Sequence, residues 1–256
     1  MIWSRIGRIA DLPTNVLPIT TIVILTGAGV SQESGLDTFR DRGGVWSRVN
    51  LEDLATPQAF HRDPAQVHAF YNDRRARLQQ PDIQPNPAHL ALARLQRDWP
   101  GEVVLVTQNV DDLHERAGTP RVIHMHGELL KARCEQCGLI LPWLGPLSVV
   151  SKCPACRDYG RLRPHVVWFG EVPLELPRIY DALARADLFV SIGTSGSVYP
   201  AAGFVGHVRS EAKVRCVELN LEPQSGSGQF DESDYGPASL ILPAFVDRLL
   251  GRVPPG

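Results

Sequence analysis

The sequence predicts an α/β fold in which a parallel β-sheet carries a smaller inserted domain. Four short segments rich in Val, Ile and Leu have the length of buried parallel strands, and each ends in Gly, Thr or Asn: residues 21–26, 102–107, 188–193 and 214–220. Helical segments are predicted at residues 66–78, 88–96 and 243–250. Such alternation is typical of a Rossmann-like sheet. Because open parallel sheets bind ligands beyond the carboxyl ends of their strands, the residues that follow these strands are the first site candidates.

Composition narrows the classes of partner. The 256 residues have room for one large domain with a smaller insertion. Lys and Arg (26) are slightly outnumbered by Asp and Glu (28), which disfavours nucleic acid and membrane surfaces as partners. No apolar segment reaches the roughly 18 residues of a membrane span, and the N-terminal residues lack the apolar core of a secretory signal. We therefore expect a cytoplasmic protein, and a monomer.

Four of the five cysteines form two CxxC pairs separated by fifteen residues: Cys134, Cys137, Cys153 and Cys156. In a reducing compartment this pattern indicates a structural Zn²⁺ site, since four thiolates complete a tetrahedron and leave no position for water. A zinc ribbon can also belong to a nucleic-acid or protein-binding module without catalysis, although no basic stripe surrounds the pairs. Cys216 falls within the fourth predicted strand and is interpreted as a core residue.

A glycine-rich turn follows the first predicted strand, with Gly27, Ala28, Gly29 and Ser31 ahead of Gly35. Glycines in such a turn let backbone N–H groups approach a pyrophosphate at the N-terminus of a following helix. The spacing is not the GxGxxG of dehydrogenases, and the turn alone is equally compatible with a purely structural role.

The continuation of this turn is more specific. The full run GAGVSQESGLDTFRDRGGVW, residues 27–46, resembles the first signature of the sirtuin family of NAD-dependent protein deacylases, and the resemblance extends over residues 20–250. It implies that a loop folds over the nicotinamide ribose of NAD, with Phe39, Arg40 and Trp46 among the cofactor contacts.

A second group of candidates follows the second predicted strand, in the run TQNVDD, and the segment HMHG comes shortly after. A neutral imidazole accepts a proton from a sugar hydroxyl near pH 7, so either His124 or His126 is a plausible general base. Residues two apart on an extended segment share a face, and spacing alone leaves the choice open. The family resemblance selects His126, which directly precedes a glycine. It also implies that Gln108, Asn109, Val110 and Asp111 form the pocket for nicotinamide and ribose. Among these, Asn109 and Asp111 are expected to have catalytic roles.

The resemblance implies further contacts along the chain. The cofactor phosphates, adenosine ribose and adenine are expected at Gly193, Thr194, Ser195, Asn220, Leu221, Glu222 and Ala238. The run RPHVVWFGE resembles the sirtuin segment that pairs, strand to strand, with an extended substrate peptide. The peptide contacts implied are Val167, Trp168, Phe169, Gly170, Glu171 and, at the other edge, Val198.

Tyr71 and Arg74 bear on substrate choice. At i and i+3 they share one helix face, and a hydroxyl beside a guanidinium suits a carboxylate. The alternative is a solvated basic helix, because Arg75 and Arg77 lie nearby. The Tyr-x-x-Arg pattern resembles that of class III sirtuins, which include the CobB-like bacterial deacylases. These enzymes remove succinyl and malonyl groups and usually acetyl groups as well.

The resemblance thus implies an enzyme that consumes NAD as co-substrate to deacylate lysine side chains of proteins, and that yields nicotinamide and O-acyl-ADP-ribose. The alternative is an NAD-dependent protein ADP-ribosyltransferase on the same fold, which the intact His126 disfavours. We expect a Rossmann-like NAD-binding domain of residues 1–36, 88–123 and 166–256. Residues 37–87 and 124–165 are expected to form the small domain, part helical and part zinc ribbon.

Overall fold

The computed structural model describes residues 19–36, 54–211 and 214–251, which form two β-sheets and the helices that cover them. The first sheet has six strands in the order β3-β2-β1-β7-β8-β9, and the second has three strands in the order β5-β4-β6. Every neighbouring pair in the first sheet is parallel. Its strands are β1 (Thr21–Thr26), β2 (Glu102–Thr107), β3 (Val122–His124), β7 (Leu188–Ile192), β8 (Arg215–Asn220) and β9 (Glu232–Tyr235). The α/β prediction is confirmed, and the four predicted strands form the centre of this sheet.

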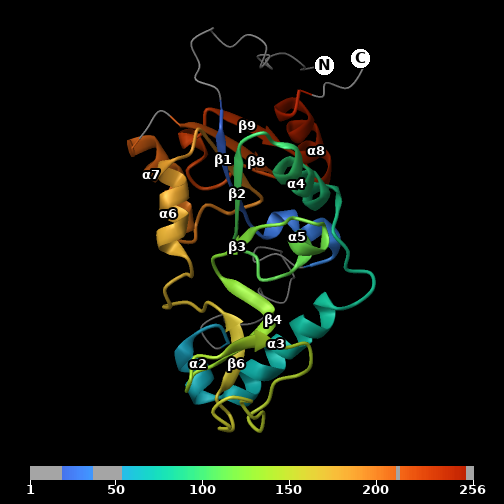
Figure 1. Ribbon diagram of the computed structural model, residues 1–256, viewed down its shortest axis with the longest axis vertical. Coiled ribbons are helices and arrows are strands. Elements are labelled where there is room, and N and C mark those ends of the chain that lie inside the picture. The colour runs from blue at the N-terminus through green and yellow to red at the C-terminus, as the bar shows by residue number, and fades with distance from the viewer. Residues whose placement is uncertain (1–18, 37–53, 212–213, 252–256) are drawn as a thin grey trace.

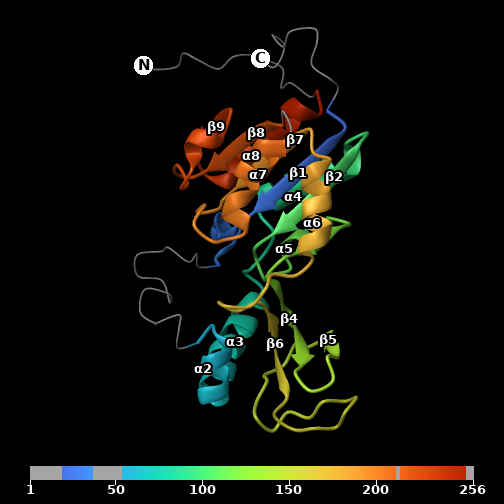
Figure 2. The ribbon, with the colours of Figure 1, turned by 90° about the vertical axis from the view of Figure 1, so that its left-hand side faces the viewer.

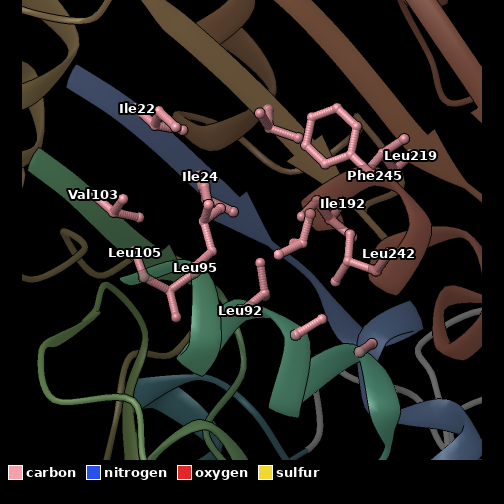
Figure 3. Packing of buried hydrophobic residues seen from close by; sticks show 14 of the residues in the cluster. Ile22, Ile24, Leu92, Leu95, Val103, Leu105, Ile192, Leu219, Leu242 and Phe245 are labelled. Carbon is pink, nitrogen blue, oxygen red and sulfur yellow. The ribbon is translucent and has the colours of Figure 1, made fainter. Parts of the chain in front are cut away.

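Helices pack on both faces of the six-stranded sheet. On one face lie α4 (Pro87–Asp98) and α8 (Ala238–Leu249), and on the other α6 (Leu176–Ala184) and α7 (Phe204–Glu211), as Figure 1 shows. Alternate residues of β1 serve the two faces, because successive strand side chains point in opposite directions. Ile22 and Ile24 pack against α4 and α8 (Figure 3), whereas Val23 and Leu25 pack toward α6 and α7. Burial on both faces explains why these strands are continuously apolar.

Helix α8 begins earlier than predicted. A proline is favoured in the first turn of a helix, so the sequence predicts a start at Pro243. The structure places Pro243 inside α8, which starts at Ala238. The N–H groups of Leu240 and Ile241 donate to the Pro237 carbonyl, and Leu242 is fully buried in the core that α4 also lines. Burial of this apolar turn outweighs the hydrogen bond that the proline removes.

The second sheet lies at the other end of the molecule (Figure 2). It contains the antiparallel strands β4 (Gly127–Cys134), β5 (Ile140–Pro142) and β6 (Leu162–Val166). Helices α2 (Pro57–Arg62) and α3 (Pro64–Leu78) pack nearby, and a core joins Tyr71 and Leu78 to Leu129 of β4 and Val166 of β6. The short helix α5 (Leu113–Arg116) follows β2. The predicted domain boundaries stay a prediction. None of the helices in the described ranges has the length and apolarity to span a membrane.

Candidate active site

A cavity of about 820 Å³ lies beyond the carboxyl ends of β1, β2, β7 and β8, where the six-stranded sheet faces α3 and the segment that follows β6. Most of the predicted site residues line it: Gly27, Ala28, Gly29, Ser31, Tyr71, Arg74, Gln108, Asn109, Val110, Asp111, His126, Val167, Trp168, Phe169, Gly170, Glu171, Gly193, Thr194, Ser195, Val198, Asn220, Leu221 and Glu222. Ala238, at the start of α8, is not among the lining residues. Phe39, Arg40 and Trp46 lie outside the described residues.

The glycines after β1 allow two loops to touch. The Gly27 N–H donates to the Ile192 carbonyl and the Gly29 N–H to the Gly193 carbonyl, each at 2.9 Å. A Cβ on Gly27 would lie 2.7 Å from the Gly193 oxygen, so no larger residue fits there. These two amides are therefore engaged by the last residue of β7 and the residue that follows it, and are not directed at a phosphate.

The helix predicted after this turn is wrong. Two 3₁₀ turns, η2 (Ala28–Val30) and η3 (Gln32–Ser34), stand in its place. The second ends at Gly35, whose φ of 85° is left-handed and stops the helical backbone.

Side chains from the loops after β1 and β2 form one hydrogen-bonded network. The Asn109 amide donates to the Gly27 carbonyl and to the Ser31 hydroxyl, both at 3.1 Å. The Ser31 hydroxyl in turn donates to Asp111 Oδ2 at 3.0 Å. Burial raises the pKa of Asp111 to about 6, although the bonds from the Leu113 N–H and Ser31 oppose this rise. The network fixes the positions of Ser31, Asn109 and Asp111 relative to each other before any ligand binds.

Two buried histidines, His89 and His114, lie beside this network, and the sequence analysis identified neither of them. His89 Nδ1 accepts the Asn86 N–H, so the proton of the neutral ring lies on Nε2, which is 3.4 Å from the Ser31 hydroxyl oxygen. His114 Nε2 lies 3.1 Å from the Thr26 hydroxyl oxygen. Burial lowers the pKa of His89 to about 4 and that of His114 well below its usual value, so both rings are neutral. The run NPAH, in which Asn86 caps α4 and His89 closes the capping box, is the signal that identifies His89.

The loop after β8 is held by a second set of buried polar groups. Gln224 Oε1 accepts hydrogen bonds from the hydroxyls of Ser191 (3.1 Å) and Thr194 (2.8 Å). The Gln224 N–H donates to the fully buried carboxylate of Glu218 at 2.7 Å, and the Asn220 amide donates to the Thr194 carbonyl at 2.7 Å. Gln224 also lines the cavity, and the sequence analysis did not identify it.

The surroundings of the two candidate histidines differ. His126 lines the cavity, and its Nδ1 lies 3.0 Å from the Gln108 carbonyl oxygen. A carbonyl only accepts, so Nδ1 carries the proton and Nε2 is the basic nitrogen of the neutral ring. Burial lowers the pKa of His126, which keeps the ring neutral at pH 7 although the Gln108 bond acts in the opposite direction.

His124, by contrast, ends β3 and is not among the cavity-lining residues. Its Nε2 lies 2.7 Å from Glu115 Oε1. Burial disfavours the charged ring, but the Glu115 carboxylate outweighs burial and raises the pKa of His124. Because His126 lines the cavity and His124 does not, the geometry favours His126 as the base.

The arginines of α3 face different surroundings, which argues against a uniformly solvated basic helix. Arg75 is 1% exposed, and its guanidinium donates to the Leu129 carbonyl and to Asn72 Oδ1. Arg77 is exposed and pairs with Asp82 at 2.7 Å. Arg74 lines the cavity with Tyr71, its guanidinium carbon 4.9 Å from the centre of the Phe70 ring.

The segment 167–171 connects the histidine segment to the far end of the cavity. The segment directly follows β6, which ends at Val166. The Val167 N–H donates to the His126 carbonyl and the Phe169 N–H to the Ala55 carbonyl, each at 2.9 Å. The Glu171 carboxylate binds both Arg163 and Arg133, so it holds the segment in place. Its predicted contact with a substrate peptide stays a prediction.

The four predicted zinc ligands meet at one point in the second sheet. The Sγ atoms of Cys134, Cys137, Cys153 and Cys156 all lie within 4.8 Å of one another. Two Sγ pairs, Cys134 with Cys156 and Cys137 with Cys153, are each 3.7 Å apart. A tetrahedron with zinc–sulfur bonds of about 2.3 Å has edges of about 3.8 Å, whereas a disulfide is about 2.05 Å. The cluster therefore fits a structural Zn²⁺ ion, while Cys216 is buried in β8 as expected.

Comparison with known proteins agrees with this architecture. Residues 27–200 match the model of the Sir2 family. The chain belongs to the Sir2 family. It is 56% identical over 229 residues to the NAD-dependent protein deacylase of Escherichia coli strain K12, which covers 90% of this chain and 82% of the relative. The NAD-dependent protein deacylase of Salmonella typhimurium strain LT2 is 55% identical, with 90% and 84% covered.

Solved structures of Sir2 homologues show the same fold. One is a Sir2 homologue in complex with NAD, 39% identical with a TM-score of 0.80, which covers 91% of this chain and 90% of the homologue. A mutant Sir2 homologue with bound ADP ribose gives the same identity and TM-score, with 90% and 91% covered.

Proposed function

We propose that this Sir2-family protein is an NAD-dependent protein lysine deacylase that removes acetyl groups and the acidic succinyl and malonyl groups. The observation that carries the proposal is that a neutral His126 and the pair Tyr71 and Arg74 line one cavity, at the carboxyl ends of the parallel strands. The relatives named as NAD-dependent protein deacylases support the deacylase activity. We further propose that it acts in the cytoplasm on acylated proteins.

The proposed site divides the work between its loops. NAD supplies a ribose carbon from which nicotinamide leaves and an ADP-ribose that receives the acyl group. His126 Nε2, the basic nitrogen, accepts the proton of a ribose hydroxyl. Ser31, Asn109 and Asp111, already joined by hydrogen bonds, orient the ribose hydroxyls. The strand-end loops with Thr194 and Asn220 hold the rest of the nucleotide, as expected for a ligand at the carboxyl ends of parallel strands. The solved homologues bound to NAD and to ADP ribose support a nucleotide as the ligand.

At the other end of the cavity, Tyr71 and Arg74 bind the terminal carboxylate of a succinyl or malonyl group. An arginine binds a carboxylate through charge-assisted hydrogen bonds, and a phenol adds one more donor. Burial raises the pKa of Tyr71 to about 12, although the bond from Trp168 and the nearby Arg74 charge lower it, so the hydroxyl keeps its proton at neutral pH. An acetyl group has no terminal carboxylate, so it occupies the same cavity without this interaction with Tyr71 and Arg74.

One assay tests the proposal against its alternative. The protein is incubated with NAD and matched peptides that carry acetyl-lysine or succinyl-lysine, and nicotinamide release and peptide mass are both measured. A deacylase releases nicotinamide in step with peptide that has lost its acyl group. An ADP-ribosyltransferase would release nicotinamide while the peptide keeps its acyl group and gains ADP-ribose. The second outcome, or no NAD-dependent change on either peptide, contradicts the proposal.

A further inference from the structure

The side chains of Trp168 and Tyr71 meet in the wall of the cavity. The indole Nε1 lies 2.9 Å from the Tyr71 hydroxyl oxygen, and the two residues are 2% and 6% exposed. Because an indole N–H donates and never accepts, the Tyr71 oxygen is the acceptor in this bond. The single proton of the phenol is then directed away from Trp168 and is available to a different acceptor.

Side chains from β6 and from the segment that follows it restrict the movement of the indole. The guanidinium carbon of Arg163 lies 3.1 Å from the centre of the Trp168 ring, and Arg163 is 1% exposed. Glu171 accepts bonds from Arg163 with both carboxylate oxygens, at 2.7 and 2.9 Å, and also accepts the Trp168 backbone N–H at 2.8 Å. The Phe60 ring centre is 5.3 Å from that of the indole. A stacked and clamped ring of this kind has little rotational freedom, so its N–H direction is set before substrate binds.

The direction of the Tyr71 hydroxyl matters for an acidic acyl group. A phenol whose proton faces a carboxylate attracts it, whereas one whose lone pairs face the carboxylate repels it. Tyr71 and Arg74 lie one helical turn apart on α3 and line the same cavity. Arg74 attracts the carboxylate whatever its exact approach, but the contribution of Tyr71 depends on which way its proton points.

We propose that Trp168 is a positioning residue for acyl selectivity: its indole N–H occupies the acceptor side of the Tyr71 hydroxyl, so that the hydroxyl presents its proton to the terminal carboxylate of an acidic acyl group. The proposal rests on the function above, in which Tyr71 and Arg74 receive that carboxylate. It assigns to Trp168 a role in selecting the acyl group in addition to its predicted place beside the substrate peptide.

A double-mutant cycle tests the proposal. Trp168→Phe keeps an aromatic ring for Arg163 and Phe60 but removes the N–H. We expect the ratio of kcat/KM for a succinyl peptide to kcat/KM for the matched acetyl peptide to fall about tenfold, mainly through a higher KM for the succinyl peptide. In a Tyr71→Phe background the hydroxyl is gone, so Trp168→Phe should cause no further loss on the succinyl peptide. An equal loss in both backgrounds, or equal losses on both peptides, would overturn the proposal.

Two further variants separate packing from hydrogen bonding. Phe60→Leu removes one packing contact of the indole, while Arg163 and Glu171 still hold the residue and its N–H is retained, so the succinyl-to-acetyl ratio should fall less than in Trp168→Phe. Should Trp168→Phe prove unfolded by circular dichroism, site-specific benzothienylalanine at position 168 keeps the bicyclic shape and replaces only the N–H by sulfur. The selective succinyl loss is expected there too, and its absence overturns the proposal.

The cycle also separates the two levels of inference. If Tyr71→Phe lowers the succinyl-to-acetyl ratio and Trp168→Phe does not, only the role of Trp168 fails. If Tyr71→Phe itself leaves the ratio unchanged, the assignment of the acidic acyl pocket fails together with it, while deacylation of both peptides would still stand.

Discussion

The two ends of the cavity are built in different ways. The end beneath the six-stranded sheet consists of strand-end loops held by backbone hydrogen bonds, such as those between Gly27, Gly29 and the loop after β7. The opposite end consists of side chains on α3. That helix is held by side-chain bonds to the carbonyl of Leu129 in β4 and to the carbonyls of Leu144 and Leu147 in the zinc-binding segment, residues 134–156. A change at the first end should therefore affect every acyl substrate alike, whereas a change at the second should alter the choice among substrates.

The largest effect is expected at the sheet end. Replacing His126 by Ala removes the proposed base, so turnover should fall by about a thousandfold or more on acetyl and succinyl peptides alike. The measurement is nicotinamide release with each peptide, and calorimetric titration with NAD should show that the nucleotide still binds. His124→Ala is the matched control, because that ring pairs with Glu115 outside the cavity. A variant that lost activity on one peptide only would contradict the division between the two ends.

Removal of zinc should impair both ends of the cavity, because β4 connects them. We expect about one Zn²⁺ per chain by elemental analysis, and loss of the metal in Cys137→Ser together with a lower temperature of thermal unfolding, because binding of a structural metal contributes to folding. Activity on both peptides should fall, since β4 runs from Gly127, next to His126, to the ligand Cys134. Cys216→Ala, a buried cysteine of β8, should retain its metal. Retention of full zinc by Cys137→Ser would show that the four thiolates are not the ligands.

Arg74 tests the acyl end directly. Arg74→Met keeps the length of the side chain and removes its charge, so kcat/KM for the succinyl peptide should fall by about 10- to 100-fold, the equivalent of losing charge-assisted hydrogen bonds. The acetyl peptide should lose only a few-fold. Arg77→Met serves as the comparison one turn along α3: this guanidinium also lines the cavity, but it is already bonded to Asp82 and to the Gly35 carbonyl, so its loss should change the succinyl-to-acetyl ratio less. Equal losses on both peptides would mean that Arg74 does not select the acyl group.

Some features at both ends of the cavity could be predicted from the sequence. The apolar strands and their polar ends follow directly from pattern, because burial on both faces demands continuous Val, Ile and Leu. Residues such as Asn109 and Asp111 could therefore be placed at the sheet edge before the fold was known, and the four cysteines were recognisable from spacing alone. The ends of the strands and the metal cluster depend on local chain geometry, which can be predicted from the order and spacing of residue types in the sequence.

The sequence did not predict the contacts between segments that lie far apart in the chain. The buried His89 and His114 look like ordinary helix residues until α4 and α5 pack against the loop after β1. The role of Gly27 depends on Gly193, which lies far along the chain. Likewise the start of α8 was misplaced because the burial of Leu242 overrides the local preference of Pro243. Tertiary packing decides each of these cases, and the local run NPAH indicates only that His89 closes the capping box of α4.

The smallest effect is expected where α3 meets the zinc-binding segment. The Asn72 side chain pairs with the backbone of Leu147, since its amide donates to the Leu147 carbonyl and its oxygen accepts the Leu147 N–H, both at 2.8 Å. Asn72→Ala removes the partner of the Leu147 carbonyl, the Leu147 N–H and one N–H of the buried Arg75. This loss should cost about 1–3 kcal/mol of unfolding free energy, measured by urea denaturation. A loosened α3 should also lower the succinyl-to-acetyl ratio a few-fold, because Tyr71 and Arg74 are carried by the same helix. Gln80→Ala, which removes a bond within α3 near its end, should change neither quantity. An unchanged ratio in a destabilised Asn72→Ala protein would show that α3 keeps its position without this contact, and that the two ends are held more independently than their hydrogen bonds suggest.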